Sequence, residues 1–228
     1  MKALITLILI SNTYLVFAQD VNFNIQGRIE DTKNAKYAYL STLSQRIPIS
    51  SDKIFMITPI VDGKFGFQGV FDLQGRTYQQ ACVFVDERGN ISKEELLSKF
   101  RKLVWVIGRE ENLREIILED LTLDIDEPAK IIYSKVVERG TLTKQLDEYN
   151  ENSRSGRKML DFVKKYPDSP FTFEVIRSLT SVIVPANRDR IESKTGSLSG
   201  LYALLSERLK NSKEGISLKQ QIDKKSKP

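Results

Sequence analysis

The sequence predicts an α+β protein in which an antiparallel β-sandwich or flattened barrel is followed by a small helical module. Hydrophobic residues alternate with a period of two between about residues 19 and 140, and they recur at helical spacing after residue 140. A hydrophobic content of 40% and an aromatic content of 9% are typical of a chain that buries a core. We therefore divide the chain into a leader at 1–18, a β-domain at 19–140, a helical module at 141–210 and a basic tail at 211–228.

Residues 1–18 have the pattern of a secretory signal peptide. Lys2 precedes an apolar run, a short polar break follows at 11–13, and small side chains up to Ala18 favour cleavage before Gln19. A membrane anchor is the alternative interpretation, but a span needs about 20 uninterrupted apolar residues. We expect a periplasmic or otherwise extracytoplasmic protein without stable membrane insertion after signal cleavage.

The first part of the β-domain shows alternating runs separated by turn residues. Asp62-Gly63 is the strongest hairpin signal in the chain, because both residue types tolerate a positive φ. Phe65 and Phe67 share one face of the run that follows this turn. The strands expected here cover 23–29, 37–40, 53–61, 65–68 and 77–85.

Ser92 and Glu95 interrupt the alternation with the Ser-X-X-Glu form of a capping box. A short helix is therefore expected from Lys93 to about Lys102. Further strands are expected at 103–107, 116–125 and 130–138. The β-domain then contains seven or eight short strands, which is typical of a sandwich.

The helical module is expected to consist of helix-turn-helix hairpins. Ser169 is a candidate N-cap, and Pro170 occupies the first position of the helix that it would start. A last helix is expected at 198–209. Residues 208–228 carry seven basic and two acidic side chains, so the net charge of +5 belongs to the tail. We expect no nucleic-acid partner, because a recognition domain would cluster basic and aromatic side chains on one folded face.

The only dense group of carboxylates comprises Glu119, Asp120, Asp124, Asp126 and Glu127. Asp124 and Asp126 alternate with Leu121, Leu123 and Ile125, which places these two carboxylates on the solvent face of a strand. Calcium needs six or more oxygen ligands, more than this linear set supplies. We predict no metal site and no cofactor.

Four residues are candidate contacts with a ligand or a partner: Cys82, Trp105, Tyr39 and Phe67. Stacked aromatic side chains favour sugar or peptide contacts, although aromatics also fill sandwich interiors. Cys82 stands in an apolar strand, where a thiol behaves as a small hydrophobic group. The alternative for Cys82 is an intermolecular disulfide in an oxidising compartment.

The β-domain resembles the domain of unknown function that precedes the thioredoxin domain in envelope thiol-disulfide interchange proteins of the TlpA/ResA-like kind. The similar stretches are Phe-Asn-Ile-Gln-Gly-Arg-Ile at 23–29, Tyr-Leu at 39–40, and Asp-Gly-Lys-Phe-Gly-Phe-Gln-Gly at 62–69, leading to Tyr78. The helical module resembles the connector of the same proteins. Its similar stretches are Phe-Val-Lys-Lys-Tyr-Pro-Asp-Ser at 162–169, the residues 201–209, and Lys-Asn-Ser-Lys-Glu-Gly at 210–215 before Leu218 and Ile222.

In that family a thioredoxin fold with Cys-X-X-Cys follows the connector, whereas this sequence reaches Pro228 without one. The absence of His and the single Cys also exclude a Ser-His-Asp triad, a His-ligated zinc and a redox pair. We therefore expect a noncatalytic binding or scaffold protein that resembles the N-terminal half of these oxidoreductases. A thioredoxin-like or other envelope protein is the expected partner. The alternatives are a truncated oxidoreductase that has lost its redox domain and a carbohydrate- or peptide-binding sandwich.

Overall fold

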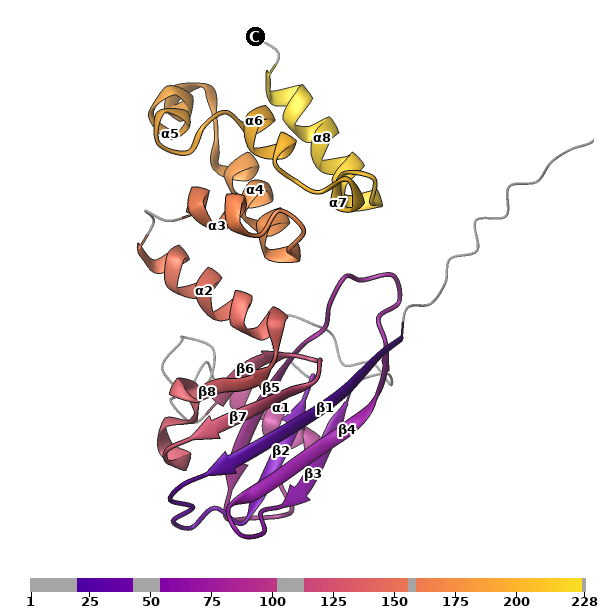
Figure 1. The fold of residues 1–228 in the computed structure, drawn as a ribbon, viewed down its shortest axis with the longest axis vertical. Helices are drawn as coiled ribbons and strands as arrows, with labels where there is room; N and C mark the ends of the chain where they lie inside the picture. Colours follow the sequence, from indigo (N-terminus) through magenta and orange to yellow (C-terminus); the bar gives the residue numbers. More distant parts are fainter. Residues whose placement is uncertain (1–19, 43–53, 102–112, 156–158, 227–228) are drawn as a thin grey trace, which may run out of the picture.

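The computed structural model describes residues 20–42, 54–101, 113–155 and 159–226. Within these ranges the strands form two four-stranded sheets, and helices form a second part at one end of the sheets (Figure 1). The fold is therefore α+β, as the sequence predicts. The predicted signal peptide and the predicted strand at 103–107 lie outside the described residues.

The first sheet has the strand order β4-β1-β7-β8. Its members are β1 (Asp20–Ile29), β4 (Lys64–Asp72), β7 (Leu121–Ile125) and β8 (Lys135–Arg139). β1 pairs with β4 and β7 pairs with β8 in antiparallel orientation, but β1 and β7 run parallel, with Ile25 opposite Leu121. The sandwich is therefore mixed at this pair, where the sequence had predicted antiparallel strands throughout.

The second sheet has the order β3-β2-β5-β6 and is antiparallel. Its strands are β2 (Tyr37–Ser41), β3 (Phe55–Pro59), β5 (Gln80–Asp86) and β6 (Leu113–Ile117). One face of this sheet meets the first sheet, and the helix α1 (Lys93–Arg101) packs on the other face. Ser92 caps α1 as predicted, because its Oγ accepts a hydrogen bond from the Glu95 backbone N–H at 3.1 Å.

The Asp62-Gly63 turn forms with positive φ at both residues, 49° and 71°. Val61 and Lys64 exchange two backbone hydrogen bonds of 2.9 Å across it. The flanking strands then separate, because β3 pairs with β2 whereas β4 pairs with β1. The turn therefore connects the two sheets and does not close a hairpin within one of them.

The run predicted as one strand at 116–125 is divided in the same way. β6 ends at Ile117 in the second sheet and β7 starts at Leu121 in the first sheet. Continuous apolar patterning predicted a single strand, but the turn at Glu119 and Asp120 carries the chain across the sandwich. The run predicted at 130–138 likewise becomes the 3₁₀-helix η1 (Pro128–Tyr133) followed by β8.

The sandwich interior is a continuous cluster of apolar side chains from both sheets. Gly27 on β1 lies opposite Phe65 on β4, and a Cβ at position 27 would lie 2.0 Å from the Phe65 ring. Because Gly27 has no side chain, the buried Phe65 ring can occupy the space next to it.

The helical part begins directly after β8. Gly140 adopts a φ of 65°, which lets the chain turn from the strand into α2. The helices of this part are α2 (Thr141–Ser155), α3 (Met159–Lys165), α4 (Pro170–Val182), the 3₁₀-helix η2 (Pro185–Asn187), α5 (Arg188–Thr195), α6 (Leu198–Ala203), α7 (Glu207–Lys210) and α8 (Lys213–Ser226). Ser169 caps α4 and Pro170 follows it at the first helical position, as predicted.

Two segments of the helical part differ from the sequence prediction. The helix predicted at 198–209 is divided into α6 and α7, because Ser206 caps α7 while its backbone N–H donates to the Pro167 carbonyl at 2.9 Å. The residues predicted as a basic tail at 211–228 contain α8. Leu218 and Ile222 of α8 are buried in the helical core, so their apolar spacing anchors this helix despite its many lysines.

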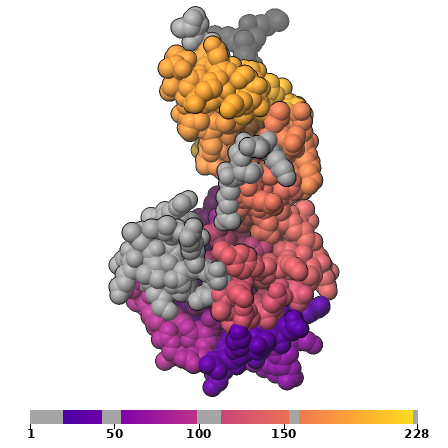
Figure 2. Space-filling model, turned by 90° about the vertical axis from the view of Figure 1, so that its left-hand side faces the viewer, coloured from indigo at the N-terminus to yellow at the C-terminus, as the bar shows by residue number. Residues whose placement is uncertain are grey.

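A buried junction joins the helical part to the sandwich. The Glu119 carboxylate accepts hydrogen bonds from the backbone N–H groups of Leu142 at 3.1 Å and Thr143 at 2.6 Å, and so caps the start of α2. The Thr143 hydroxyl donates to Glu119 at 2.8 Å and accepts from the Ile117 N–H at 3.1 Å. In the space-filling view the helical part stands on one end of the sandwich, with the coral-coloured start of this part between them (Figure 2).

We predict that Gly27→Ala lowers the free energy of unfolding by about 1–3 kcal/mol, because the added methyl group overlaps the buried Phe65 ring. Gly66→Ala is the matched control, because a Cβ there meets only the Gln26 side chain at 3.0 Å. Urea denaturation of both variants measures the difference. Equal stability of the two variants would contradict the packing described for β1 and β4.

We predict that Thr143→Val lowers the free energy of unfolding by about 1–3 kcal/mol, because it leaves the Ile117 N–H and the Glu119 carboxylate without their hydroxyl partner. Thr141→Val is the control, since Thr141 is exposed in the same helical turn. Thermal unfolding and hydrogen exchange at Ile117 report the change. Unaltered exchange at Ile117 in Thr143→Val would show that this junction is not the contact that orders the end of β6.

Candidate ligand-binding groove

The structure places three of the four predicted contact residues, Tyr39, Phe67 and Cys82, in the interior of the sandwich domain. Tyr39 and Phe67 are 0% and 2% exposed, and the Tyr39 ring stacks on Phe84 with 4.7 Å between ring centroids. The Tyr39 hydroxyl donates to the Arg88 carbonyl and accepts from the Ile91 N–H. These two aromatic side chains offer no surface to a ligand, and Trp105 lies outside the described residues.

Cys82 is buried between the second sheet and α1, together with Tyr39 and Leu96. Burial away from water raises the pKa of its thiol to about 12, and the nearby Glu115 carboxylate adds to the increase. The thiol is therefore protonated at physiological pH and enclosed by apolar side chains.

Three of the five carboxylates that are dense in the sequence have separate structural partners. Glu119 caps α2, Asp120 pairs with Arg139 at 2.7 Å, and Glu127 pairs with Lys33 and Lys130. Hydrogen bonds from these two lysines lower the pKa of Glu127 to about 2. Among the described residues no group of three or more potential metal ligands converges.

The β4–β5 loop faces the helical part (Figure 1). Residues of this loop and of the helices line a groove. We define this interlobe groove by residues 76–80 of the loop and the start of β5, by Pro170, Phe173, Glu174 and Arg177 of α4, and by Leu209, Ser212 and Glu214 at α7 and α8. It encloses about 300 Å³. Cavities at the boundary between two packed parts of a chain are a common position for ligand sites.

Apolar side chains form the floor of the interlobe groove. Tyr78 packs on Phe171 with 5.2 Å between ring centroids, and Phe171 in turn stacks on Tyr149 of α2 at 5.8 Å. Phe173 and Leu209, which are 8% and 2% exposed, continue this floor along α4 and α7. The floor is thus built from a loop of the β-domain and two helices, α4 and α7, and its shape depends on how the two parts are joined.

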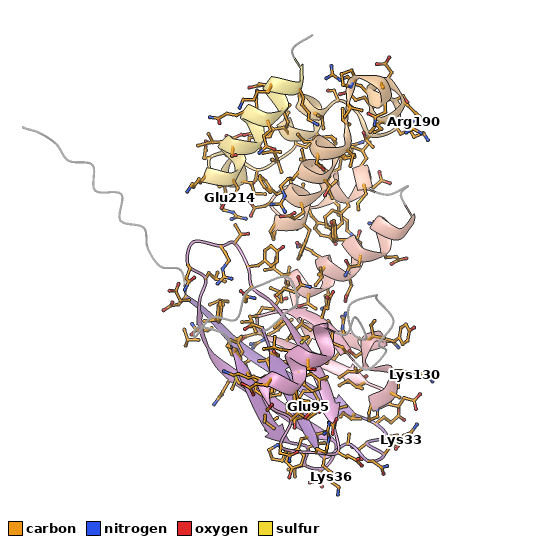
Figure 3. The ribbon with its side chains drawn as sticks, turned by 180° about the vertical axis from the view of Figure 1, so that it is seen from behind. Lys33, Lys36, Glu95, Lys130, Arg190 and Glu214 are labelled. Atoms are coloured by element: carbon orange, nitrogen blue, oxygen red, sulfur yellow. The ribbon has the colours of Figure 1, made fainter. Side chains whose placement is uncertain are left out.

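Charged groups stand on both walls of the groove. Arg76 lines the sandwich side and forms no ion pair with the described residues. On the helical side Arg177 pairs with Glu174, while Glu214 forms no ion pair within the described ranges. Figure 3 shows Glu214 at the end of α8 nearest the sandwich. The groove therefore offers an uncompensated cation on one wall and an uncompensated carboxylate on the other.

Neutral hydrogen-bonding groups complete the lining. The Tyr78 hydroxyl makes no hydrogen bond to the described residues, and burial of the ring is the main reason that its pKa is raised. It is therefore a neutral donor and acceptor at physiological pH. Gln80 is exposed at the start of β5 and also faces the groove.

Sequence patterns did not identify the interlobe groove. Its lining comes from segments about a hundred residues apart in the chain, and the local motifs that include some of these residues do not show that they meet. Tyr78 was part of the noted family resemblance, but its position against α4 depends on the junction of the two parts.

Comparisons with known proteins give no neighbour for this chain: no family model matches it, and neither a curated protein nor a solved structure shows significant similarity. In the part of the chain that the structure describes, we find no helix both long and apolar enough to span a membrane. The groove is therefore interpreted from its own geometry.

We predict that Cys82 in the folded protein does not react with a disulfide reagent such as DTNB at about pH 8, because the thiol is buried and protonated. The same thiol should react fully once guanidinium chloride unfolds the chain, which serves as the internal control. Rapid reaction of the native protein would contradict the burial of Cys82 and would favour the intermolecular disulfide.

Proposed function

We propose that this chain is a noncatalytic binding or scaffold protein that acts outside the cytoplasm and holds a peptide segment of a partner in the interlobe groove. The observation that carries the proposal is the groove itself, in which an apolar floor lies between walls with uncompensated charges of both signs. Peptides match such a lining, because each residue combines an apolar or polar side chain with backbone donors and acceptors. An envelope protein of the thioredoxin-like class is the partner that the sequence resemblance implies.

The composition supports a noncatalytic role, because the chain has no His and one Cys. That Cys is buried with a raised pKa, so it is a poor nucleophile. The carbohydrate-binding alternative relied on exposed aromatic side chains, and the burial of Tyr39 and Phe67 removes two of them. The extracytoplasmic location rests on the sequence of residues 1–18.

We predict that Gln80→Trp weakens peptide binding at least about tenfold, because the indole fills the groove next to Tyr78. Wild-type protein is first used to select binders from a library of short synthetic peptides, and calorimetry then compares the affinity of each selected peptide for wild type and variant. Gln68→Trp is the matched control, since Gln68 is exposed on β4 away from the groove.

Binding that survives Gln80→Trp unchanged would place the peptide elsewhere on the molecule. Failure of the wild-type protein to select any peptide above background would count against the proposed function as a whole. Circular dichroism of both tryptophan variants establishes that they are folded before affinities are compared.

A further inference from the structure

We infer that the interlobe groove recognises the free carboxylate at the C-terminal end of a peptide whose last side chain is apolar. This inference rests on the proposed function and specifies which part of the partner enters the groove. It follows from the state of Arg76, from the floor beside it and from the charges on the opposite wall.

Arg76 is held in a fixed position with its hydrogen-bonding capacity partly unused. Its Nε donates to the Leu73 carbonyl at 2.9 Å, and its Nη1 donates to the Gln79 side-chain oxygen at 2.6 Å. The guanidinium carbon also lies 5.5 Å from the centroid of the Phe71 ring. Nη2 is buried and has no hydrogen-bond partner. The side chain is therefore preorganised while one of its donors is left unsatisfied.

A carboxylate satisfies this guanidinium better than the present arrangement does. Gln79 supplies one neutral oxygen to Nη1, whereas a carboxylate that replaces it can accept from Nη1 and Nη2 together. A carboxylate also adds the attraction between opposite charges, which the neutral Gln79 oxygen does not supply. Replacing the Gln79 oxygen with a carboxylate also compensates the positive charge of Arg76, which has no ion-pair partner among the described residues.

The rest of the groove distinguishes a chain terminus from other anions. On the helical wall Glu174 is paired with Arg177, whereas Glu214 forms no ion pair within the described ranges, so Glu214 repels a doubly charged phosphate group more strongly than a singly charged carboxylate. The apolar floor of Tyr78, Phe173 and Leu209 accepts a hydrophobic side chain beside the carboxylate. A C-terminal residue carries both groups on one Cα. A volume of about 300 Å³ is at the small end for ligand cavities, which suits a chain end.

The experiment uses N-acetylated short peptides with apolar last residues, each synthesised once with a free C-terminal carboxylate and once as the amide. We expect the full-length wild-type protein to prefer the acid about tenfold in calorimetric titrations. Arg76→Gln should reduce the ratio of affinities to about one. Arg190→Gln is the charge-matched control, because Arg190 is exposed on the far side of the helical part (Figure 3), and it should keep the wild-type ratio.

Arg76→Lys provides a second variant in case Arg76→Gln does not fold, because it keeps the charge and loses the bidentate geometry. It should show a preference for the acid between those of wild type and Arg76→Gln. Equal affinity of wild type for acids and amides, or an unaltered ratio in the folded Arg76 variants, overturns this inference and leaves groove-dependent peptide binding in place. If the wild-type protein binds none of the peptides, that result instead overturns the proposed function.

Discussion

The arrangement of this protein depends on the junction between Glu119, Thr143 and Ile117. One carboxylate at the end of β6 satisfies the free N–H groups at the start of α2, and one hydroxyl connects that carboxylate to the strand backbone. Thr143 is 0% exposed, so these hydrogen bonds form away from water. Arg114 of β6 adds a bidentate ion pair to Asp147 of α2, with distances of 2.7 and 2.6 Å. Together these contacts set the direction in which the helical part leaves the sandwich.

That direction brings separate segments of the chain together. α2 places Tyr149 against Phe171, and Phe171 receives Tyr78 from the β4–β5 loop. These aromatic side chains pack between the sandwich and the helical part, and the charged side chains of Arg76 and Glu214 line the walls of the groove beside them. The interlobe groove is thus a consequence of joining two parts through a small buried polar contact. The proposed peptide site therefore does not belong to either part alone.

Burial of the second sheet on both faces explains why Tyr39 and Cys82 are structural, and Phe67 of β4 lies in the cluster between the two sheets. α1 covers the face that carries Tyr39, Cys82 and Phe84, and the first sheet covers the opposite face. Aromatic side chains on this sheet therefore pack with one another and with α1. The surface available for binding is displaced to the end of the sandwich, where the β4–β5 loop extends beyond the sheets (Figure 1).

Local features of the fold follow from neighbouring residues in the sequence. The α+β class, the caps at Ser92 and Ser169 and the positive-φ turn at Asp62-Gly63 all follow from local periodicity or from the conformational preference of a few residues. The tertiary structure determines which strands pair, because a period of two shows that a strand is half-buried but does not show which strand lies beside it. It therefore decided that 116–125 crosses between sheets, that β1 and β7 run parallel and that Leu218 and Ile222 fasten α8 to the helical core. The groove belongs to the same category, since Arg76, Phe173 and Glu214 become neighbours only after both parts have packed.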